Sequence, residues 1–213
     1  MKSFILEFKR VFISTAILLL VTLAGKVYCQ NNELIDPDIH PLIGQLSPDI
    51  KAKALSGKTF DLAEFRGKIV VVNFWGLKCS PCYQEIIELN VLGEEYKNKN
   101  VVVISLMTDS REEVLKKVKT SGEFYKFYRA QAGNENIKFE IIPDAQQIIS
   151  KFTIEGVPMN FIVDQNGIIK GFSNGYRQSY SYSNRNVAPQ ESENYKVIAA
   201  KINDVIVGDK GNE

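Results

Sequence analysis

The chain has 213 residues, of which 45% are hydrophobic and 24% charged, and its formal net charge is +1. This length and composition are typical of one ordinary globular domain with short additions. The near-neutral charge argues against a nucleic-acid partner, because nucleic-acid-binding proteins need a concentrated basic surface.

Residues 1–29 have the pattern of an export signal. Three basic residues among the first ten precede an apolar stretch, residues 11–24, that is fourteen residues long. A membrane-spanning helix needs about twenty residues, so we predict a cleaved signal peptide. An uncleaved membrane tether formed by residues 11–24 and a lipid anchor at Cys29 are the alternatives.

Residues 30–43 are polar and contain two prolines, which predicts an extended lead-in to a domain at residues 44–207. We expect His40, within this lead-in, to be solvated. Residues 48–62 alternate loosely between apolar and polar side chains around a Ser-Gly-Lys turn. This pattern predicts a hairpin at the edge of a sheet, followed by a helical turn at residues 62–66.

The most informative stretch is GKIVVVNFWGLKCSPCYQEIIELN, residues 67–90. Residues 69–75 are apolar on both faces, which predicts a buried central strand of an α/β sheet. Residues 83–96 then have a helical pattern. Two cysteines, Cys79 and Cys82, therefore lie at the first turn of a helix that follows a strand.

A helix N-terminus makes a thiol reactive, because its unpaired N–H groups stabilise the thiolate. Cys79 lies at this end, beside the positive charge of Lys78, so we assign it as the attacking nucleophile. Cys82 lies one turn further along and is assigned as the resolving thiol. A zinc site is disfavoured because zinc needs four ligands and His40 is the only histidine. A structural disulfide that closes so small a loop would stabilise the fold little.

The run FWGLKCSPCYQE, preceded by SGKTFDLAEFRGKIVVVN, resembles the TlpA/ResA-like branch of the thioredoxin-fold thiol–disulfide oxidoreductases. The positions that carry the resemblance are Gly67, Lys68, Phe74, Trp75, Cys79, Pro81, Cys82 and Glu85. The chain departs from the usual pattern at Lys78, where the branch has Trp, and at Ile87, where it has Pro. The resemblance implies an α/β thioredoxin-like three-layer sandwich, with a central mixed β-sheet and an N-terminal hairpin. It implies no cofactor or metal beyond a redox-active Cys79–Cys82 disulfide.

A candidate acid–base residue follows from the same match. Thioredoxins proper have a buried Asp where this chain has Asn73, and an amide cannot take a proton from a thiol at neutral pH. Glu85 lies three residues after Cys82, on the same helix face. Burial would raise its pKa and make it a proton acceptor for Cys82. If Glu85 is exposed, it is an ordinary helix glutamate.

Further along the chain, the pattern predicts a buried strand at residues 101–107, a helix at 111–128 capped near Ser110, a short strand at 138–142 and a short helix at 145–152. The aromatic residues of 124–128 are expected in or near the core rather than on a partner surface.

Residues 156–164 complete the resemblance. Pro158 matches the cis-proline that faces the two cysteines in the thioredoxin fold. Val157, just before it, would offer its backbone to an incoming substrate strand. With Trp75 and Lys78, these two residues form the predicted substrate-binding surface.

The C-terminal part is predicted as a hairpin, a loop and a helix. An Asn-Gly turn at residues 166–167 separates two short apolar runs, which indicates a hairpin. Residues 173–189 have no apolar period and are expected to form a surface loop. Residues 195–207 have the spacing of an amphipathic helix, and 208–213 are expected to fray.

These observations predict an exported thiol–disulfide oxidoreductase that reduces disulfides of extracytoplasmic proteins, in the periplasm or an equivalent compartment. Such a compartment is oxidising, so a membrane or periplasmic thiol donor would have to keep the pair reduced. One alternative is a non-enzymatic thioredoxin-fold binding module of an envelope complex. Another, a peroxiredoxin, is disfavoured because Gly76 stands where that class has a Thr.

Overall fold

The computed structural model describes residues 40–120, 137–177 and 188–210. Three predicted features lie outside these ranges: the export signal at 1–29, the aromatic residues of 124–128 and the middle of the loop at 173–189. Within them, no helix is both long enough and apolar enough to cross a membrane.

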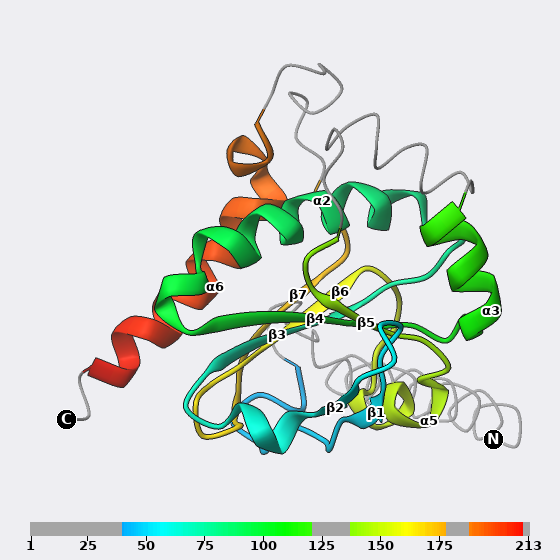
Figure 1. Ribbon diagram of the computed structural model, residues 1–213. Coiled ribbons are helices and arrows are strands. Elements are labelled where there is room, and N and C mark those ends of the chain that lie inside the picture. The colour runs from blue at the N-terminus through cyan, green and yellow to red at the C-terminus, as the bar shows by residue number, and fades with distance from the viewer. Residues whose placement is uncertain (1–39, 121–136, 178–187, 211–213) are drawn as a thin grey trace, which may run out of the picture. The chain divides into compact units, whose positions relative to one another are not determined.

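The domain that begins at His40 is built on a five-stranded mixed sheet with strand order β5-β4-β3-β6-β7 (Figure 1). The pairs β3–β4 and β4–β5 are parallel, and β3–β6 and β6–β7 are antiparallel. The strands are β3 (Ile69–Phe74), β4 (Val101–Leu106), β5 (Glu140–Ile142), β6 (Met159–Val163) and β7 (Ile169–Asn174). The predicted mixed sheet is confirmed, and the buried central strand predicted at residues 69–75 is β3.

Helices and a hairpin cover the two faces of this sheet and give three layers (Figure 1). Helices α2 (Ser80–Glu95) and α6 (Glu193–Lys210) cover one face. The opposite layer holds the hairpin of β1 (Lys51–Lys53) and β2 (Thr59–Asp61), a 3₁₀ turn (Leu62–Phe65) and α5 (Gln146–Ile149). Helix α3 (Arg111–Val114) begins at a capping box formed by Ser110 and Glu113 and continues as a π-helix over Leu115–Thr120. The predicted thioredoxin-like α/β sandwich with its N-terminal hairpin is confirmed.

The alternation of side chains along β3 explains why its sequence is apolar throughout. Val70, Val72 and Phe74 pack into the core beneath the hairpin and α5. Ile69 and Val71 point the other way and pack against α2 and α6. Because both faces are covered, neither set of positions tolerates polar side chains except where those side chains find partners.

The prediction that His40 is exposed to solvent is wrong. His40 is only 7% exposed, and its ring contacts the rings of Phe161 and Phe172. Its Nδ1 accepts the N–H of Leu42, and Nε2 lies 3.3 Å from the carbonyl oxygen of Thr153. Both ring nitrogens therefore have backbone partners, which offset the free-energy cost of burying the imidazole.

The extended lead-in predicted at residues 30–43 also differs from the structure in its described part, residues 40–43. Residues 41–44 form a turn. The chain then joins the start of β7, because Gly44 donates to the carbonyl of Ile169 and Ile169 donates to that of Gln45.

Two boundaries near the C-terminus differ from the prediction. Strand β7 extends through Asn174, so the segment expected as a surface loop begins with a buried residue, Ser173. Helix α6 starts at Glu193 and runs through Lys210, so residues 208–210 are helical rather than frayed. At the end of β7 the hydroxyl of Ser173 accepts from the buried Asn160, a contact that a search for apolar periodicity does not detect.

The aromatic cluster below the sheet gives a first prediction. Phe161 is fully buried and lies within ring-contact distance of four other rings, those of His40, Phe74, Phe152 and Phe172. Phe161→Ala should lower the free energy of unfolding in urea by about 3–5 kcal/mol, through lost burial and the cavity left behind. Val207→Ala, at a site 69% exposed, should change it by no more than about 0.5 kcal/mol. A loss below about 1 kcal/mol for Phe161→Ala would contradict this role.

Candidate active site

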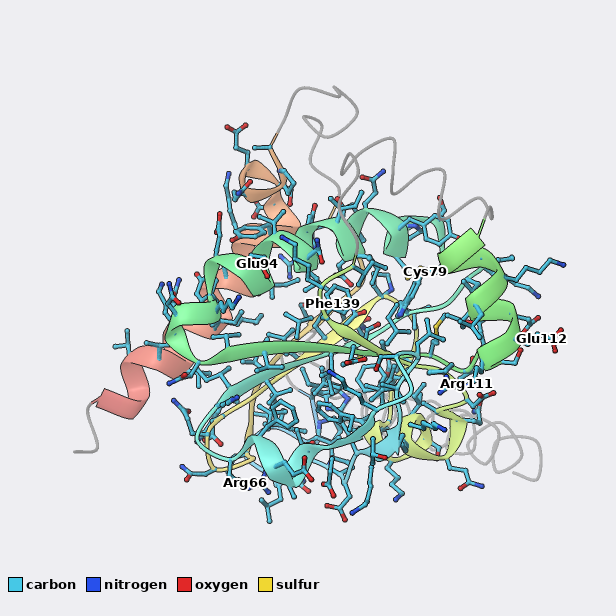
Figure 2. The ribbon with its side chains drawn as sticks, viewed as in Figure 1. Arg66, Cys79, Glu94, Arg111, Glu112 and Phe139 are labelled. Atoms are coloured by element: carbon cyan, nitrogen blue, oxygen red, sulfur yellow. A yellow bond between two sulfur atoms is a disulfide. The ribbon has the colours of Figure 1, made fainter. Side chains whose placement is uncertain are left out.

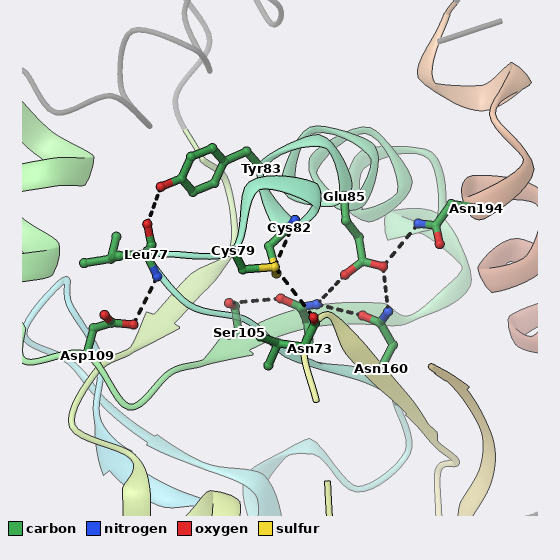
Figure 3. The surroundings of a disulfide bond; sticks show 11 residues. Asn73, Leu77, Cys79, Cys82, Tyr83, Glu85, Ser105, Asp109, Asn160 and Asn194 are labelled. Carbon is green, nitrogen blue, oxygen red and sulfur yellow. Dashed lines mark hydrogen bonds between the residues drawn. A yellow bond between two sulfur atoms is a disulfide. The ribbon is translucent and has the colours of Figure 1, made fainter. Parts of the chain in front are cut away.

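Strand β3 and the loop after it deliver two cysteines to the N-terminus of α2. In Figure 2, Cys79 and Glu94 mark the opposite ends of that helix. Cys79 is the N-cap residue, and it forms a disulfide with Cys82 across a Cα–Cα distance of 5.3 Å. The backbone N–H of Cys82 points at Cys79 Sγ from 3.2 Å (Figure 3). Cys79 is partly exposed, whereas Cys82 is fully buried. The sulfur that a substrate can reach is therefore the one at the helix terminus.

The loop that presents Cys79 is held through the backbone of one residue, Leu77. Its N–H donates to Asp109 Oδ2 at 3.1 Å, and its carbonyl accepts the hydroxyl of Tyr83 (Figure 3). Gly76 precedes it, and a Cβ there would lie 3.4 Å from the same Asp109 oxygen. The sequence pattern placed Asp109 only near a helix cap and gave no role to Tyr83, because both contacts cross between elements.

The predicted cis-proline lies beside the disulfide. The Val157–Pro158 peptide bond is cis. The carbonyl oxygen of Val157 lies 3.7 Å from Cys79 Sγ, a contact rather than a hydrogen bond because a disulfide sulfur carries no proton. Val157 is 41% exposed, so its backbone is accessible next to the reactive sulfur. The structure thus brings together four predicted residues, Cys79, Cys82, Val157 and Pro158.

Of the two other predicted substrate-binding residues, Trp75 lies differently. It is only 2% exposed and packs in the cluster that holds Cys82, Ile86 and Met107, so its side chain supports the site from within. Its assignment to the substrate surface is therefore corrected, because its ring is covered just after β3 ends. Lys78 is exposed next to Cys79.

Glu85 lies behind the disulfide and is fully buried. Three side-chain amides donate to its carboxyl group: Asn73 at 2.9 Å, Asn160 at 3.0 Å and Asn194 at 3.1 Å (Figure 3). Burial raises the pKa of Glu85 from 4.5 to about 7, although the three amide hydrogen bonds oppose that shift by stabilising the carboxylate. The sequence predicted Glu85 as a proton acceptor if it was buried, and that condition is met.

The amides around Glu85 belong to a polar row that crosses the sheet. In register, Ser105 of β4 pairs with Asn73 of β3, Asn73 with Asn160 of β6, and Asn160 with Ser173 of β7. All four are buried and hydrogen-bonded along the row: Ser105 donates to Asn73, Asn73 to Asn160, and Asn160 to Ser173. Of these only Asn73 was considered from the sequence, since strand register cannot be read from the separate segments.

A second buried acid, Glu88, lies one turn further along α2 and is 1% exposed. Asn194 donates to it at 2.9 Å, and the hydroxyl of Tyr176 donates at 2.8 Å. Burial raises its pKa, and these hydrogen bonds oppose the shift. Sequence reasoning missed Glu88, Asn194 and Tyr176. The only available signal was an acid three residues after Glu85 on the same helix face.

No group of three or more His, Cys, Asp or Glu within residues 40–120, 137–177 and 188–210 is arranged to hold a metal ion. Within the same ranges, the disulfide is the redox-active group that the site contains. The arrangement can therefore exchange electrons with a disulfide or a thiol through its own two sulfurs.

Comparison with known proteins places this site in context. A family model described as the AhpC/TSA family matches residues 43–172. The thioredoxin-like protein YneN of Bacillus subtilis is 32% identical over 127 residues, which are 60% of this chain and 68% of that protein. The thiol-disulfide oxidoreductase ResA of Geobacillus kaustophilus is 29% identical over 168 residues, 78% of this chain and 88% of that protein.

Solved structures share the fold. A thiol:disulfide interchange protein of the thioredoxin family from Chlorobium tepidum has a TM-score of 0.53 at 19% identity, over 79% of this chain and 99% of that one. A mitochondrial 2-Cys peroxiredoxin from Plasmodium falciparum has a TM-score of 0.59 at 21% identity, over 81% of this chain and 98% of that one. At these identities the likeness concerns the fold, which both classes of protein share.

The raised pKa of Glu85 gives a prediction about stability. Between pH of about 4.5 and 7 the folded protein binds a proton at Glu85 that the unfolded chain has released, so stability falls as the pH rises. Relative to Glu85→Gln, the wild-type free energy of unfolding should decrease by roughly 2–4 kcal/mol from pH 4.5 to pH 7.5. Urea unfolding at several pH values measures this difference. Glu94→Gln, on the exposed face of the same helix, should keep the wild-type slope. An identical slope in Glu85→Gln would show that Glu85 titrates normally.

Proposed function

The chain belongs to the AhpC/TSA family and is a thioredoxin-fold thiol–disulfide oxidoreductase similar to ResA, and on this premise we propose that it reduces disulfide bonds of exported proteins. The observation that carries the proposal is the position of Cys79. Its sulfur lies at a helix N-terminus, faces one backbone N–H and adjoins the exposed backbone of Val157. A substrate strand that pairs with Val157 would bring its disulfide to this sulfur.

The proposed cycle starts from the dithiol form. The Cys79 thiolate attacks one substrate sulfur, the substrate S–S bond breaks, and the departing substrate thiolate takes a proton from solvent. Cys82 then gives its proton to Glu85 and attacks Cys79 Sγ. The bond between Cys79 and the substrate breaks, and the second substrate sulfur leaves as a thiolate. The substrate gains two electrons, and the protein is left with the Cys79–Cys82 disulfide, which an external thiol donor reduces again.

Two features of the site support the reductive direction. Among the described residues, one backbone N–H faces Cys79 Sγ, so stabilisation of the thiolate is modest. The buried acids Glu85 and Glu88 lie behind Cys82, and any negative charge on them disfavours a thiolate nearby. A strong oxidant such as DsbA owes its high potential to a stabilised reduced form, and charge on Glu85 or Glu88 would work against such stabilisation.

The place of action rests on the N-terminal sequence. Residues 1–29 have the features of an export signal, which supports action in the periplasm or another extracytoplasmic compartment. The partners would be disulfide-containing proteins together with a membrane or periplasmic thiol donor. Retention of residues 11–24 would give a membrane-tethered form of the same enzyme.

The alternatives fit the site less well. A binding module would not need a buried acid behind a redox-active disulfide. A peroxiredoxin shares the fold, but here the position three residues before Cys79 is Gly76, which brings no hydroxyl group to a bound peroxide. The same glycine instead makes room for Asp109.

Substitution of each cysteine tests the cycle. Cys79→Ser should lower the rate of insulin disulfide reduction at least about 100-fold, because the nucleophile is lost. Cys82→Ser should instead accumulate a mixed disulfide with the substrate, visible by non-reducing electrophoresis and mass spectrometry. Retained reduction by Cys79→Ser would refute the assignment, and consumption of hydrogen peroxide at a rate above that of insulin reduction would favour a peroxidase.

Redox equilibration tests the direction. Incubation of the protein with graded ratios of reduced and oxidised glutathione, followed by thiol trapping, gives the potential of the Cys79–Cys82 pair. A reductant should equilibrate near the value of thioredoxin, about −270 mV. A value near that of DsbA, about −120 mV, would reverse the proposed direction.

A further inference from the structure

Two acids on α2 are buried side by side and joined through one amide group. Asn194 Nδ2 donates to Glu85 Oε1 at 3.1 Å and to Glu88 Oε2 at 2.9 Å. The two exposed fractions are 0% and 1%. The description of the site given so far uses Glu85 and leaves Glu88 without a function.

The described part of the chain pairs neither acid with a base. Among residues 40–120, 137–177 and 188–210, no ion pair involves Glu85 or Glu88. The groups that face them from β3, β6 and α6 are the amides of Asn73, Asn160 and Asn194. The titratable groups nearby are Cys82, one turn earlier on α2, and Tyr176, which follows β7. Arg177 is exposed and reaches this network through its backbone N–H, 3.5 Å from Asn194 Oδ1.

Two carboxylates this close in a buried site cannot both ionise at little cost, because each charge raises the proton affinity of the other. Such a pair titrates as a unit and retains one proton over a range of pH. The hydroxyl of Tyr176 and the amide of Asn194 donate to the Glu88 carboxylate, and the charge on Glu88 raises the pKa of Glu85.

We propose that Glu88 is a positioning residue for the proton transfer from Cys82: it titrates with Glu85 as a pair that shares one proton, and its charge thereby sets the pH at which Glu85 accepts the Cys82 proton. This inference rests on the proposed role of Glu85. When Glu85 takes the proton of Cys82, Glu88 keeps its charge and the negative charge of the acid pair falls by one.

The outer part of this network comes from the C-terminal segment. Tyr176 and Asn194 lie beyond residues 43–172, the part of the chain that the family model matches. Glu88 lies within that part, and the two side chains that donate to it come from beyond residue 172.

The test uses the full chain and follows Glu85 directly. In ¹³C-detected titrations of the glutamate carboxyl carbons of the oxidised protein, Glu85 and Glu88 should titrate in coupled steps. In Glu88→Gln the midpoint of Glu85 should fall by about one pH unit, because the neighbouring charge is gone. The acid limb of the pH profile for insulin reduction should move to lower pH in the same direction.

Two variants serve as controls. Glu94→Gln removes the same charge from the exposed side of α2 and should leave both midpoints in place. Tyr176→Phe removes a donor to the Glu88 carboxylate, so it should raise the midpoint of Glu88, whereas Glu88→Gln lowers that of Glu85. A purely structural role for Glu88 would lower the rate at every pH without moving a midpoint.

The outcomes separate this inference from the function on which it rests. Glu85→Gln should abolish the acid limb; if the limb persists, the role of Glu85 fails. If Glu85→Gln abolishes the limb while Glu88→Gln leaves the Glu85 midpoint unchanged, the shared proton is refuted and the role of Glu85 remains.

Discussion

The arrangement of the site depends on the free-energy cost of burying one carboxyl group, that of Glu85. A buried acid must be neutral or must be surrounded by donors, since the charged form loses its hydration. Here the donors for Glu85 come from three separate elements, β3, β6 and α6, and each is an asparagine amide. To align them, β3 and β6 must pair in one register and α6 must begin at one position over the sheet. The requirements of a single side chain thus connect the sheet to the helices above it.

The reactive end of the site follows a different rule. Cys79 is placed by the junction between β3 and α2, and its loop is held through the backbone N–H and the carbonyl of Leu77. The sulfur of Cys79 thus lies near the protein surface on a fixed backbone, and Glu85, the proposed proton acceptor of Cys82, lies in the interior. In the proposed cycle this division lets the first step occur with a large protein substrate and the second away from water.

Local patterns predicted what depends on local sequence. The buried strand β3 was predictable because its residues are apolar on both faces, and the thiol pair because Cys-Ser-Pro-Cys opens a helix. Glu85 was predictable because a three-residue spacing on a helix repeats one face. The remaining features depend on long-range contacts. Asn194 is separated from Glu85 by 109 residues, and the burial of His40 depends on Phe161 and Phe172. Trp75 was assigned to the surface because the strand's end could not be placed relative to the core.

The polar partners contributed by Tyr176 and Asn194 have a consequence for engineering. Three of the hydrogen bonds to the two buried acids come from these residues, two to Glu88 and one to Glu85. Because α6 is one of the layers that cover the sheet, the proton affinity of the interior depends on the C-terminal part of the chain as well as on the cysteine motif. Substitutions at Tyr176 or Asn194 would therefore retune the working pH of the oxidoreductase while both cysteines stayed in place.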